Sequence, residues 1–411
     1  MRRRLCVLWC VILVGVGGAA ARADEHEALI ALLIKKGLIT ESELNEVKTE
    51  LASQPTKPMS APAVTNARSL RISGRWAAGY QHSGKEGTNP SGAFRVPDAK
   101  LRFDVQPDAV NTLVTRLNVS NATFNDVDYL YMESKDFLPW LKDSPVGLTT
   151  RLGRVKMDFG EETWSNNAVE SALPSTSIAN VAGHDEGLQL MTSLKSDWSP
   201  RLSLGVFNGN SGGGTDNTGA KAYSAKLSVI PVEPLFLSIS FFDSRETKGG
   251  GTELGIGGLT TAPAGAVNWA RRVWEVDARY DIGRGSAPLN PPAFTDSTAY
   301  LRTAYGLFTD SAKGGTDRRG DYAYLEGLWN FHPRWHAASR WSILDFDHDV
   351  AATIGGITGV KREQRYALGG GFRWSESTLL KGEWLVDHES GRPIADDASN
   401  NQFSLIAASQ F

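Results

Sequence analysis

Residues 98–105 read Asp-Ala-Lys-Leu-Arg-Phe-Asp-Val, so apolar and charged side chains alternate without interruption. The stretch 273–282 repeats this alternation, with Trp274 and Val276 on one parity and Glu275 and Asp277 on the other. Successive side chains of a β-strand point to opposite faces, whereas a helix would scatter these charges around its surface. Both stretches therefore predict strands with one apolar face and one charged face.

The same period of two dominates the chain from Leu70 onward. It predicts about sixteen antiparallel strands, over 70–81, 93–105, 112–121, 125–133, 147–158, 186–195, 200–208, 221–230, 235–243, 270–282, 297–308, 320–331, 335–346, 363–374, 378–388 and 401–411. The 42 Gly and 12 Trp, with a negative mean hydropathy, fit alternating strands flanked by aromatic girdles. A soluble secreted β-protein has a similar composition, so composition alone leaves both classes open.

Connections and hydropathy favour a closed barrel. Beyond residue 23 the chain has no apolar run long enough for a spanning helix, and only closed barrels otherwise satisfy every backbone group in hydrocarbon. Short connections such as 231–234 and 332–334 alternate with long ones such as 159–185 and 244–269. This asymmetry is typical of outer-membrane barrels. We therefore expect an all-β, transmembrane antiparallel barrel over residues 68–411.

The first 23 residues have the form of a secretory signal peptide, with Arg2–Arg4, an apolar run and a small-residue end before Asp24. An uncleaved membrane anchor is the alternative interpretation. Cys6 and Cys10 fall in this segment, so the exported chain would have no thiol, and we expect neither a metal nor a cofactor. Loss of four arginines would change the net charge from −3 to about −7, which argues against nucleic acid as a partner.

Residues 24–52 predict a short helical segment in the periplasm, with Leu29, Leu32 and Leu33 on one face and a capping box at 40–43. It would serve in oligomerisation or as a spacer, or else be a leader without a partner. Residues 53–67, with three prolines among small polar residues, predict a flexible linker.

Three motifs carry a resemblance to a known family. They are 151–161 (Arg-Leu-Gly-Arg-Val-Lys-Met-Asp-Phe-Gly-Glu), 170–174 (Glu-Ser-Ala-Leu-Pro) and 205–209 (Gly-Val-Phe-Asn-Gly). In order and spacing they resemble the phosphate-selective porin O and P family. The resemblance implies a sixteen-stranded homotrimeric porin of a Gram-negative outer membrane, narrowed by an inward-folded third external loop at 159–185. Phosphate-specific members line the passage with basic side chains, and no comparable arginine ladder is evident in this sequence.

The C-terminal strand ends in Phe411, which shares its parity with Phe403, Leu405 and Ala407. This ending resembles the signal that the barrel-assembly machinery reads in outer-membrane proteins. We therefore expect that machinery, with outer-membrane lipid, among the partners.

The function expected from these patterns is a water-filled channel for passive diffusion of small hydrophilic solutes and ions, with a preference for anions that includes phosphate as one option. Parity places these basic candidates on the pore lining: Arg71, Arg75, Lys100, Arg102, Arg116, Arg151, Lys226, Arg279, Arg302, Arg340, Arg365, Arg373 and Lys381. Arg154 and Lys156 break the parity of their strand, so they either point inward at a bulge or lie at the external rim. Acidic candidates on the constriction loop are Glu161, Glu162, Asp185 and Glu186.

Two other classes remain as alternatives. A non-conducting structural or adhesion barrel would bind partners through its external loops, although about sixteen strands enclose an aqueous bore. An outer-membrane hydrolase would need a base beside a nucleophile or water, with His184 and His388 as the candidates. We expect no enzymatic activity.

Overall fold

The computed structural model describes Thr40 and residues 69–411, apart from 121–123, 125, 142–143, 166, 210–217, 249–250, 284–297, 348–351, 355–356 and 392–397. The predicted signal peptide, the linker and, apart from Thr40, the helical segment lie outside the described residues.

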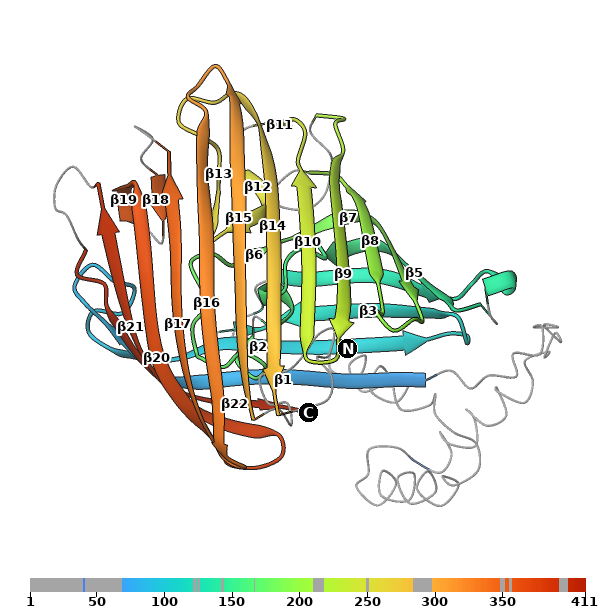
Figure 1. The fold of residues 1–411 in the computed structure, drawn as a ribbon, viewed down its shortest axis with the longest axis horizontal. Helices are drawn as coiled ribbons and strands as arrows, with labels where there is room; N and C mark the ends of the chain where they lie inside the picture. Colours follow the sequence, from blue (N-terminus) through green and yellow to red (C-terminus); the bar gives the residue numbers. More distant parts are fainter. Residues whose placement is uncertain are drawn as a thin grey trace. The chain divides into compact units, whose positions relative to one another are not determined.

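The described residues form one large antiparallel sheet of seventeen strands, one of which, β11 (Thr247–Lys248), is a two-residue addition beside β14. The other sixteen are β1 (Ser69–Ser83), β2 (Ala93–Gln106), β3 (Asn111–Asn118), β4 (Asp126–Lys135), β5 (Val146–Lys156), β7 (His184–Leu194), β8 (Arg201–Phe207), β9 (Ala222–Val232), β10 (Leu235–Asp243), β14 (Asn268–Ile282), β15 (Ala299–Lys313), β16 (Arg318–His332), β17 (Trp335–Phe346), β20 (Arg362–Arg373), β21 (Thr378–Ser390) and β22 (Gln402–Gln410). Each overlaps one predicted range, so the strand prediction is confirmed (Figure 1).

Pairing of the first strand with the last closes the sheet into a barrel. Residues 75–83 of β1 pair with residues 402–410 of β22, while the other edge of β1 pairs with β2. At the seam, Gly74 and Phe411 exchange two backbone hydrogen bonds of 3.0 Å. A Cβ at Gly74 would lie 2.5 Å from the Phe411 ring and 2.9 Å from the Lys100 carbonyl oxygen, so the absence of a side chain at Gly74 allows this close approach at the seam. The closed sixteen-stranded barrel predicted from alternation is therefore present.

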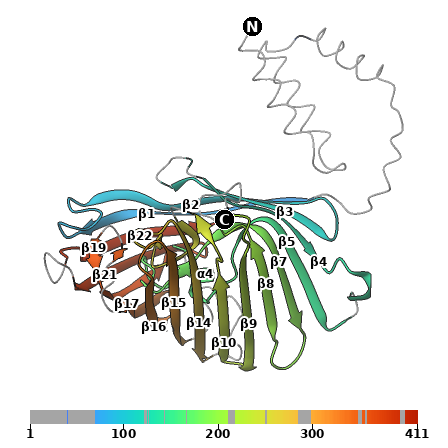
Figure 2. The same cartoon turned by 90° about the horizontal axis from the view of Figure 1, so that it is seen from above.

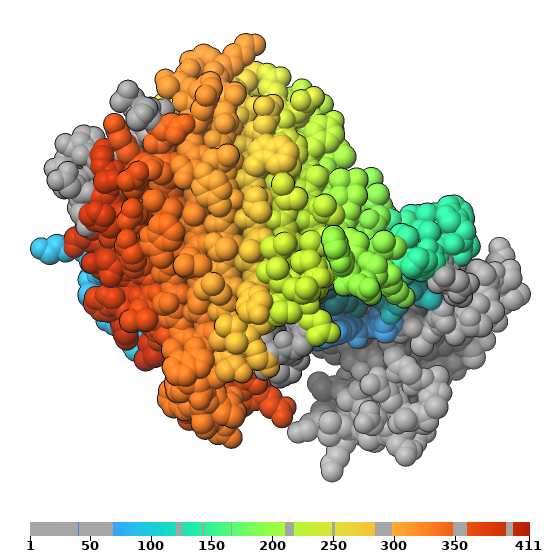
Figure 3. Space-filling view, viewed as in Figure 1, coloured from blue at the N-terminus to red at the C-terminus, as the bar shows by residue number. Residues whose placement is uncertain are grey.

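Exposure shows which parity faces outward. On β14, Trp274 and Val276 are 50% and 55% exposed, whereas Glu275 and Asp277 are 4% and 1% exposed. The apolar set therefore covers the outside of the barrel, and the charged set lies inside. Figure 3 shows the outer face of the strands from green to red as one continuous surface. Large apolar side chains that are exposed there include Tyr305, Leu307, Leu325, Trp329, Leu368 and Trp384.

The two ends of the barrel differ. At the turn end, β9 leads into β10 through two residues and β16 leads into β17 through two residues. The longer turn before β5 contains the short helix η2 (Pro139–Leu141). The opposite, loop end carries a small hairpin of β18 (Ala352–Ile354) and β19 (Ile357–Val360). Among the described residues, no helix is long and apolar enough to cross a membrane.

Two segments from the loop end fold into the barrel. The first inner segment, 157–183, contains α4 (Glu162–Ser165) and β6 (Val181–Ala182); Figure 2 shows α4 inside the ring of strands. The second inner segment, 251–261, forms β12 (Gly251–Ile256) and β13 (Leu259–Thr261). β12 pairs with both β6 and β13, so the two segments form one small sheet. The inward path of the first segment agrees with the sequence prediction, whereas the second was predicted only as a long external loop.

Candidate functional site

A cavity of about 1240 Å³ lies inside the barrel beside β1–β5. One wall consists of the inner face of these strands, and the first inner segment with β22 forms the other. Among the described residues that line it, nine are Lys or Arg and four are Asp or Glu. We call this part of the barrel the open side.

Two arginines of the open side share one aromatic ring. Arg102 of β2 and Arg116 of β3 are register partners, and their guanidinium carbons lie 5.9 and 4.2 Å from the centre of the Tyr129 ring. Stacking of this kind favours the cation and fixes the plane of the guanidinium group. These two cations are therefore held in place on the wall before any solute enters.

Carboxylates on this wall are shared between cations. Asp128 accepts from Arg116 at 2.8 Å and from Lys100 at 3.1 Å. Glu133 lies 2.8 Å from Arg151 and 3.1 Å from Lys135. Each of these carboxylates leaves one positive charge uncompensated, so the wall keeps a positive potential despite its ion pairs. Arg75 differs, because it has Asp98 to itself at 2.7 Å.

Arg154 and Lys156, which sequence parity groups together, have different surroundings. Lys156 lines the cavity, donates to the Thr163 carbonyl, and has its ammonium 5.3 Å from the Trp164 ring centre. No carboxylate among the described residues lies within ion-pair distance of it. Arg154 instead pairs with Glu186 at 3.1 Å and does not line the cavity. Of the two alternatives left open for this pair, an inward direction therefore fits Lys156, whereas Arg154 lies away from the cavity.

The first inner segment is fastened to the far wall through its backbone. Lys381 donates to the carbonyls of Ala168 (2.7 Å) and Ser171, and Arg340 donates to the carbonyl of Ser175 (2.9 Å). In return, the Glu383 carboxylate accepts from the Ser175 amide at 2.9 Å. These wall side chains are buried, so the loop replaces water as their partner.

Two acidic residues of this segment face buried arginines. Glu161 lies 3.8 Å from both Arg279 and Arg302, and Glu162 lies 3.7 Å from Arg340. We call this part of the barrel, from β10 to β21, the filled side. There Arg279, Arg302 and Arg340 are paired with carboxylates and covered by protein.

Asp185 and Glu186 belong to β7 rather than to the loop, which corrects their predicted place. Asp185 is buried and accepts from the Gly209 amide at 2.6 Å, so it does not face a basic wall. Glu186 forms an ion pair with Arg154. Of the four acidic candidates predicted on the constriction loop, Glu161 and Glu162 therefore belong to it, and they face the arginines of the filled side.

Asp158 anchors the base of the first inner segment, just beyond the end of β5. Its carboxylate accepts from Trp164 Nε1 at 2.8 Å and lies 3.3 Å from Lys226 and 3.8 Å from Arg201. Burial by itself would raise the pKa of Asp158, but Lys226 and Arg201 outweigh it and hold the pKa below its usual value. The carboxylate therefore stays charged at neutral pH and ties the loop to β8 and β9.

The second inner segment is held by a buried triad. Asp310 lies 2.8 Å from Arg271 and 2.7 Å from Arg318. The side chains of Asp310 and Arg271 are fully buried. Arg271 also donates to the carbonyls of Leu254 (3.0 Å) and Leu259 (2.5 Å), while Arg318 donates to the Thr261 carbonyl (2.7 Å). β12 and β13 lie behind β14 and β15 in Figure 1. Arg271 lies within the predicted strand 270–282, but Asp310 lies beyond the predicted strand 297–308, and neither residue was a predicted site residue.

The structure divides the predicted basic candidates into separate groups. On the cavity wall it places Arg71, Arg75, Lys100, Arg102, Arg116, Arg151 and Lys156. Against the inner segments it places Lys226 of β9 and, on the filled side, Arg279, Arg302, Arg340, Arg365 and Lys381. Arg373 ends β20 at the turn end. Sequence parity identifies the inward face, but not whether water or protein lies opposite; it also missed Lys135 and Arg201, which line the cavity.

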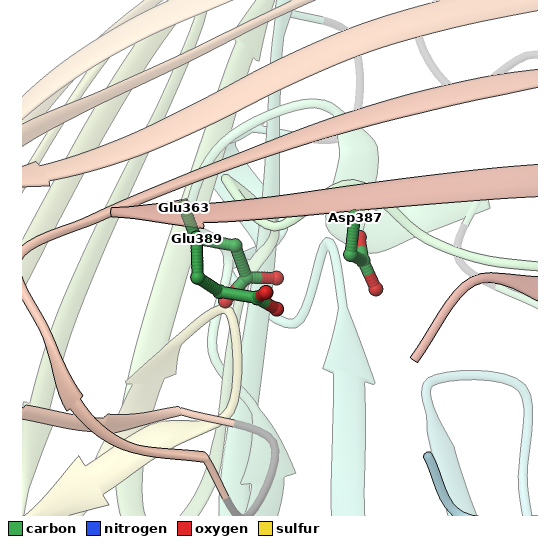
Figure 4. A group of neighbouring side chains, drawn as sticks. All are labelled: Glu363, Asp387 and Glu389. Atoms are coloured by element: carbon green, nitrogen blue, oxygen red, sulfur yellow. The ribbon is translucent and has the colours of Figure 1, made fainter. Parts of the chain in front are cut away.

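Glu363, Asp387 and Glu389 bring carboxylate oxygens within 4.8 Å of one another near the loop end (Figure 4). Arg365 donates to Asp387 at 2.6 Å and to Glu363 at 3.3 Å. The Ala398 amide donates to Glu389 at 3.1 Å. Each carboxylate therefore already has a protein partner, and we assign no metal to the group.

The histidines proposed for hydrolysis have structural surroundings. His184 is in β7 rather than in a loop, and its ring stacks on Tyr129 with 6.3 Å between centroids. His336 lies inside the barrel on β17, 3.0 Å from the Ala172 carbonyl. His388 is exposed on the outer parity of β21. These rings are not gathered at one place.

No family model matches the chain, and no curated protein matches it. Solved structures match in fold. The outer membrane channel DcaP of Acinetobacter baumannii aligns with a TM-score of 0.55 at 10% identity, over 84% of this chain and 97% of DcaP. The chain shares this barrel fold.

Two further solved structures agree. OmpT, an outer membrane protein of Vibrio cholerae in trimer form, aligns with a TM-score of 0.53 at 11% identity, over 84% of this chain and 100% of that one. The anion-selective porin from Comamonas acidovorans aligns with a TM-score of 0.51 at 11% identity, over the same shares. At these identities the likeness concerns architecture, and the resemblance to the phosphate-selective porin O and P family stays a prediction.

Proposed function

We propose that the protein is a porin of a Gram-negative outer membrane, through which small hydrophilic solutes diffuse passively with a preference for anions. The observation that carries the proposal is the charge of the cavity wall, nine basic against four acidic residues among those described. A lumen lined mainly by one sign of charge raises the local concentration of the opposite ion. The channel DcaP and the anion-selective porin from Comamonas acidovorans share this fold, which supports the same class.

The route we propose is the open side. On the filled side the inner segments occupy the space beside β10–β21 and hydrogen-bond to the wall, whereas the cavity beside β1–β5 is open. Anions would therefore pass along Arg102, Arg116 and Arg151, with Lys156 near the loop end.

The remaining parts of the proposal concern export and assembly. Residues 1–23 would direct export and be removed, Phe411 would be read by the barrel-assembly machinery, and the protein would form a homotrimer. The trimer form of the Vibrio cholerae neighbour supports the last point. Cross-linking of the purified protein in detergent, followed by mass measurement, would test it.

The experiment that tests the function is planar-bilayer recording in asymmetric potassium chloride. We expect discrete conductance steps. We also expect a reversal potential that is displaced from zero toward the equilibrium potential of chloride. Arg116→Glu should lower the anion-to-cation permeability ratio about fivefold, because close unit charges in water interact by about 1 kcal/mol. Arg319→Glu is the matched control, since Arg319 is exposed and has outward parity on β16. Cation selectivity of the wild type would contradict the proposed preference.

A non-conducting adhesion barrel is separated by the same recording, because such a barrel gives no conductance steps. Its loops would then be the functional surface.

A further inference from the structure

The two walls of the open side have different chemistry, and this difference bears on which anions fit. One wall, formed by β1–β5, carries Arg75, Lys100, Arg102, Arg116 and Arg151. The facing wall, formed by the first inner segment and β22, presents the apolar Trp164, Ala168, Pro174 and Ile406 among polar side chains, which are Asn167, Glu170, Ser171, Thr176 and Gln410. Cations thus line one side of the passage, and apolar groups contribute much of the other.

Charge on the facing wall is sparse and of the opposite sign. Glu170 is its single charged side chain among the described lining residues, and it accepts a hydrogen bond from Asn167. The Trp164 indole is oriented by its 2.8 Å hydrogen bond to Asp158, and its ring lies next to the Lys156 ammonium. An aromatic face is therefore fixed beside a cation that has no carboxylate partner among the described residues.

From this arrangement we infer that the preferred solutes are small organic anions with a carboxylate at one end and a hydrocarbon or aromatic body at the other. This inference rests on the proposed anion channel. The carboxylate would face the arginines, where guanidinium groups match its two oxygens. The apolar body would lie against Trp164 and Pro174, so that the apolar surfaces of the solute and of the wall are removed from water.

Inorganic phosphate fits this passage less well. Its oxygens are hydrated on all sides. On the facing wall the Asn167 amide and the Ser171 hydroxyl already donate to Glu170 and to the Leu173 carbonyl, so few donors are left to replace that water. Glu170 would in addition repel a second negative charge. A phosphate-selective passage would instead need donors around the whole ion, and the described lining places most of its donors on one side.

The test compares three anions as blockers of the chloride current through the wild-type channel: benzoate, acetate and inorganic phosphate. At a mildly acidic pH all three carry close to one charge, so hydration and shape are the main differences. We expect the half-blocking concentration of benzoate to be about tenfold lower than those of acetate and phosphate, which is a modest difference in affinity. Phosphate block as strong as benzoate block would overturn the inference, even if the channel is anion-selective.

A pair of variants locates the effect. Trp164→Gln should raise the half-blocking concentration of benzoate about fivefold and leave that of acetate unchanged. Trp198→Gln is the control, because Trp198 is 62% exposed between β7 and β8 and does not line the cavity. Unchanged benzoate block in Trp164→Gln would contradict the assigned wall. Absence of conductance or cation selectivity in the wild type would instead defeat the proposed function itself, so the two failures are distinct.

Discussion

The open side and the filled side of the barrel have the same alternating sequence pattern, but their inward charges have different partners. On both, charged side chains alternate with apolar ones and point inward. On the open side Arg102 and Arg116 face a cavity, whereas on the filled side Arg271 and Arg340 end on loop carbonyls. Inward parity therefore makes a charge available, and the loop opposite decides whether solute or protein uses it.

The largest effect is expected where the filled side would be opened. Arg271→Met leaves Asp310 with Arg318 alone and removes the donors to Leu254 and Leu259. Breaking a buried ion pair costs about 3 kcal/mol, so the second inner segment should detach. We expect single-channel conductance to rise about twofold, because a segment that narrows the lumen is lost.

The control for this variant is the next residue of the same strand. The Arg272 side chain is 60% exposed and pairs with Asp243 at 3.2 Å, so Arg272→Met should cost less than about 1 kcal/mol and leave conductance unchanged. Equal conductance in the two variants would show that the second inner segment does not limit the passage, and the distinction between the sides would fail there.

A smaller effect should separate Lys156 from Arg154. Lys156→Gln removes an uncompensated cation from the cavity wall and should lower the anion-to-cation permeability ratio about twofold. Arg154→Gln should leave that ratio unchanged, because Arg154 pairs with Glu186 away from the cavity. Reversal potentials in asymmetric potassium chloride measure both. A shift in Arg154→Gln as large as that in Lys156→Gln would place both cations in the passage.

The smallest effect concerns pH at the boundary between the two sides. Because the folded-state pKa of Asp158 is lowered, its stabilising contribution is complete above the ordinary Asp pKa and is lost as pH falls through the folded-state value. We expect current fluctuations to increase below about pH 4, where the carboxylate begins to take up a proton and its ion pairs at the loop base weaken. Asp158→Asn should fluctuate at neutral pH. A pH-independent wild-type current would contradict the anchoring role of this carboxylate.

The strands could be predicted because their signal is local. Alternation at 98–105 and 273–282 specifies a strand and its two faces without knowledge of any partner. The first inner segment was predicted through its resemblance to a family loop. The second inner segment was missed because its path depends on Arg271, Asp310 and Arg318, which meet only after three strands have paired.

Part of the site could be predicted because the direction of a side chain on a strand is also a local property. The inward direction of Lys100, Arg102 and Arg116 follows from parity alone. Their sharing of Asp128 and Tyr129 requires the register of β2–β4, including the irregularity between Arg116 and Leu117. The different surroundings of Arg154 and Lys156 depend on where β4 stops pairing with β5, at Leu130 and Arg154.

The manner in which the first inner segment is attached has a consequence for its variability. The wall side chains form hydrogen bonds with main-chain atoms of Ala168 and Ser175, through Lys381, Arg340 and Glu383. Every amino acid except proline has both the main-chain amide and the carbonyl. Homologues could therefore exchange the side chains at positions such as 168 and 174 while the loop keeps its course. Solute preference in such a channel can diverge rapidly on an unchanged frame.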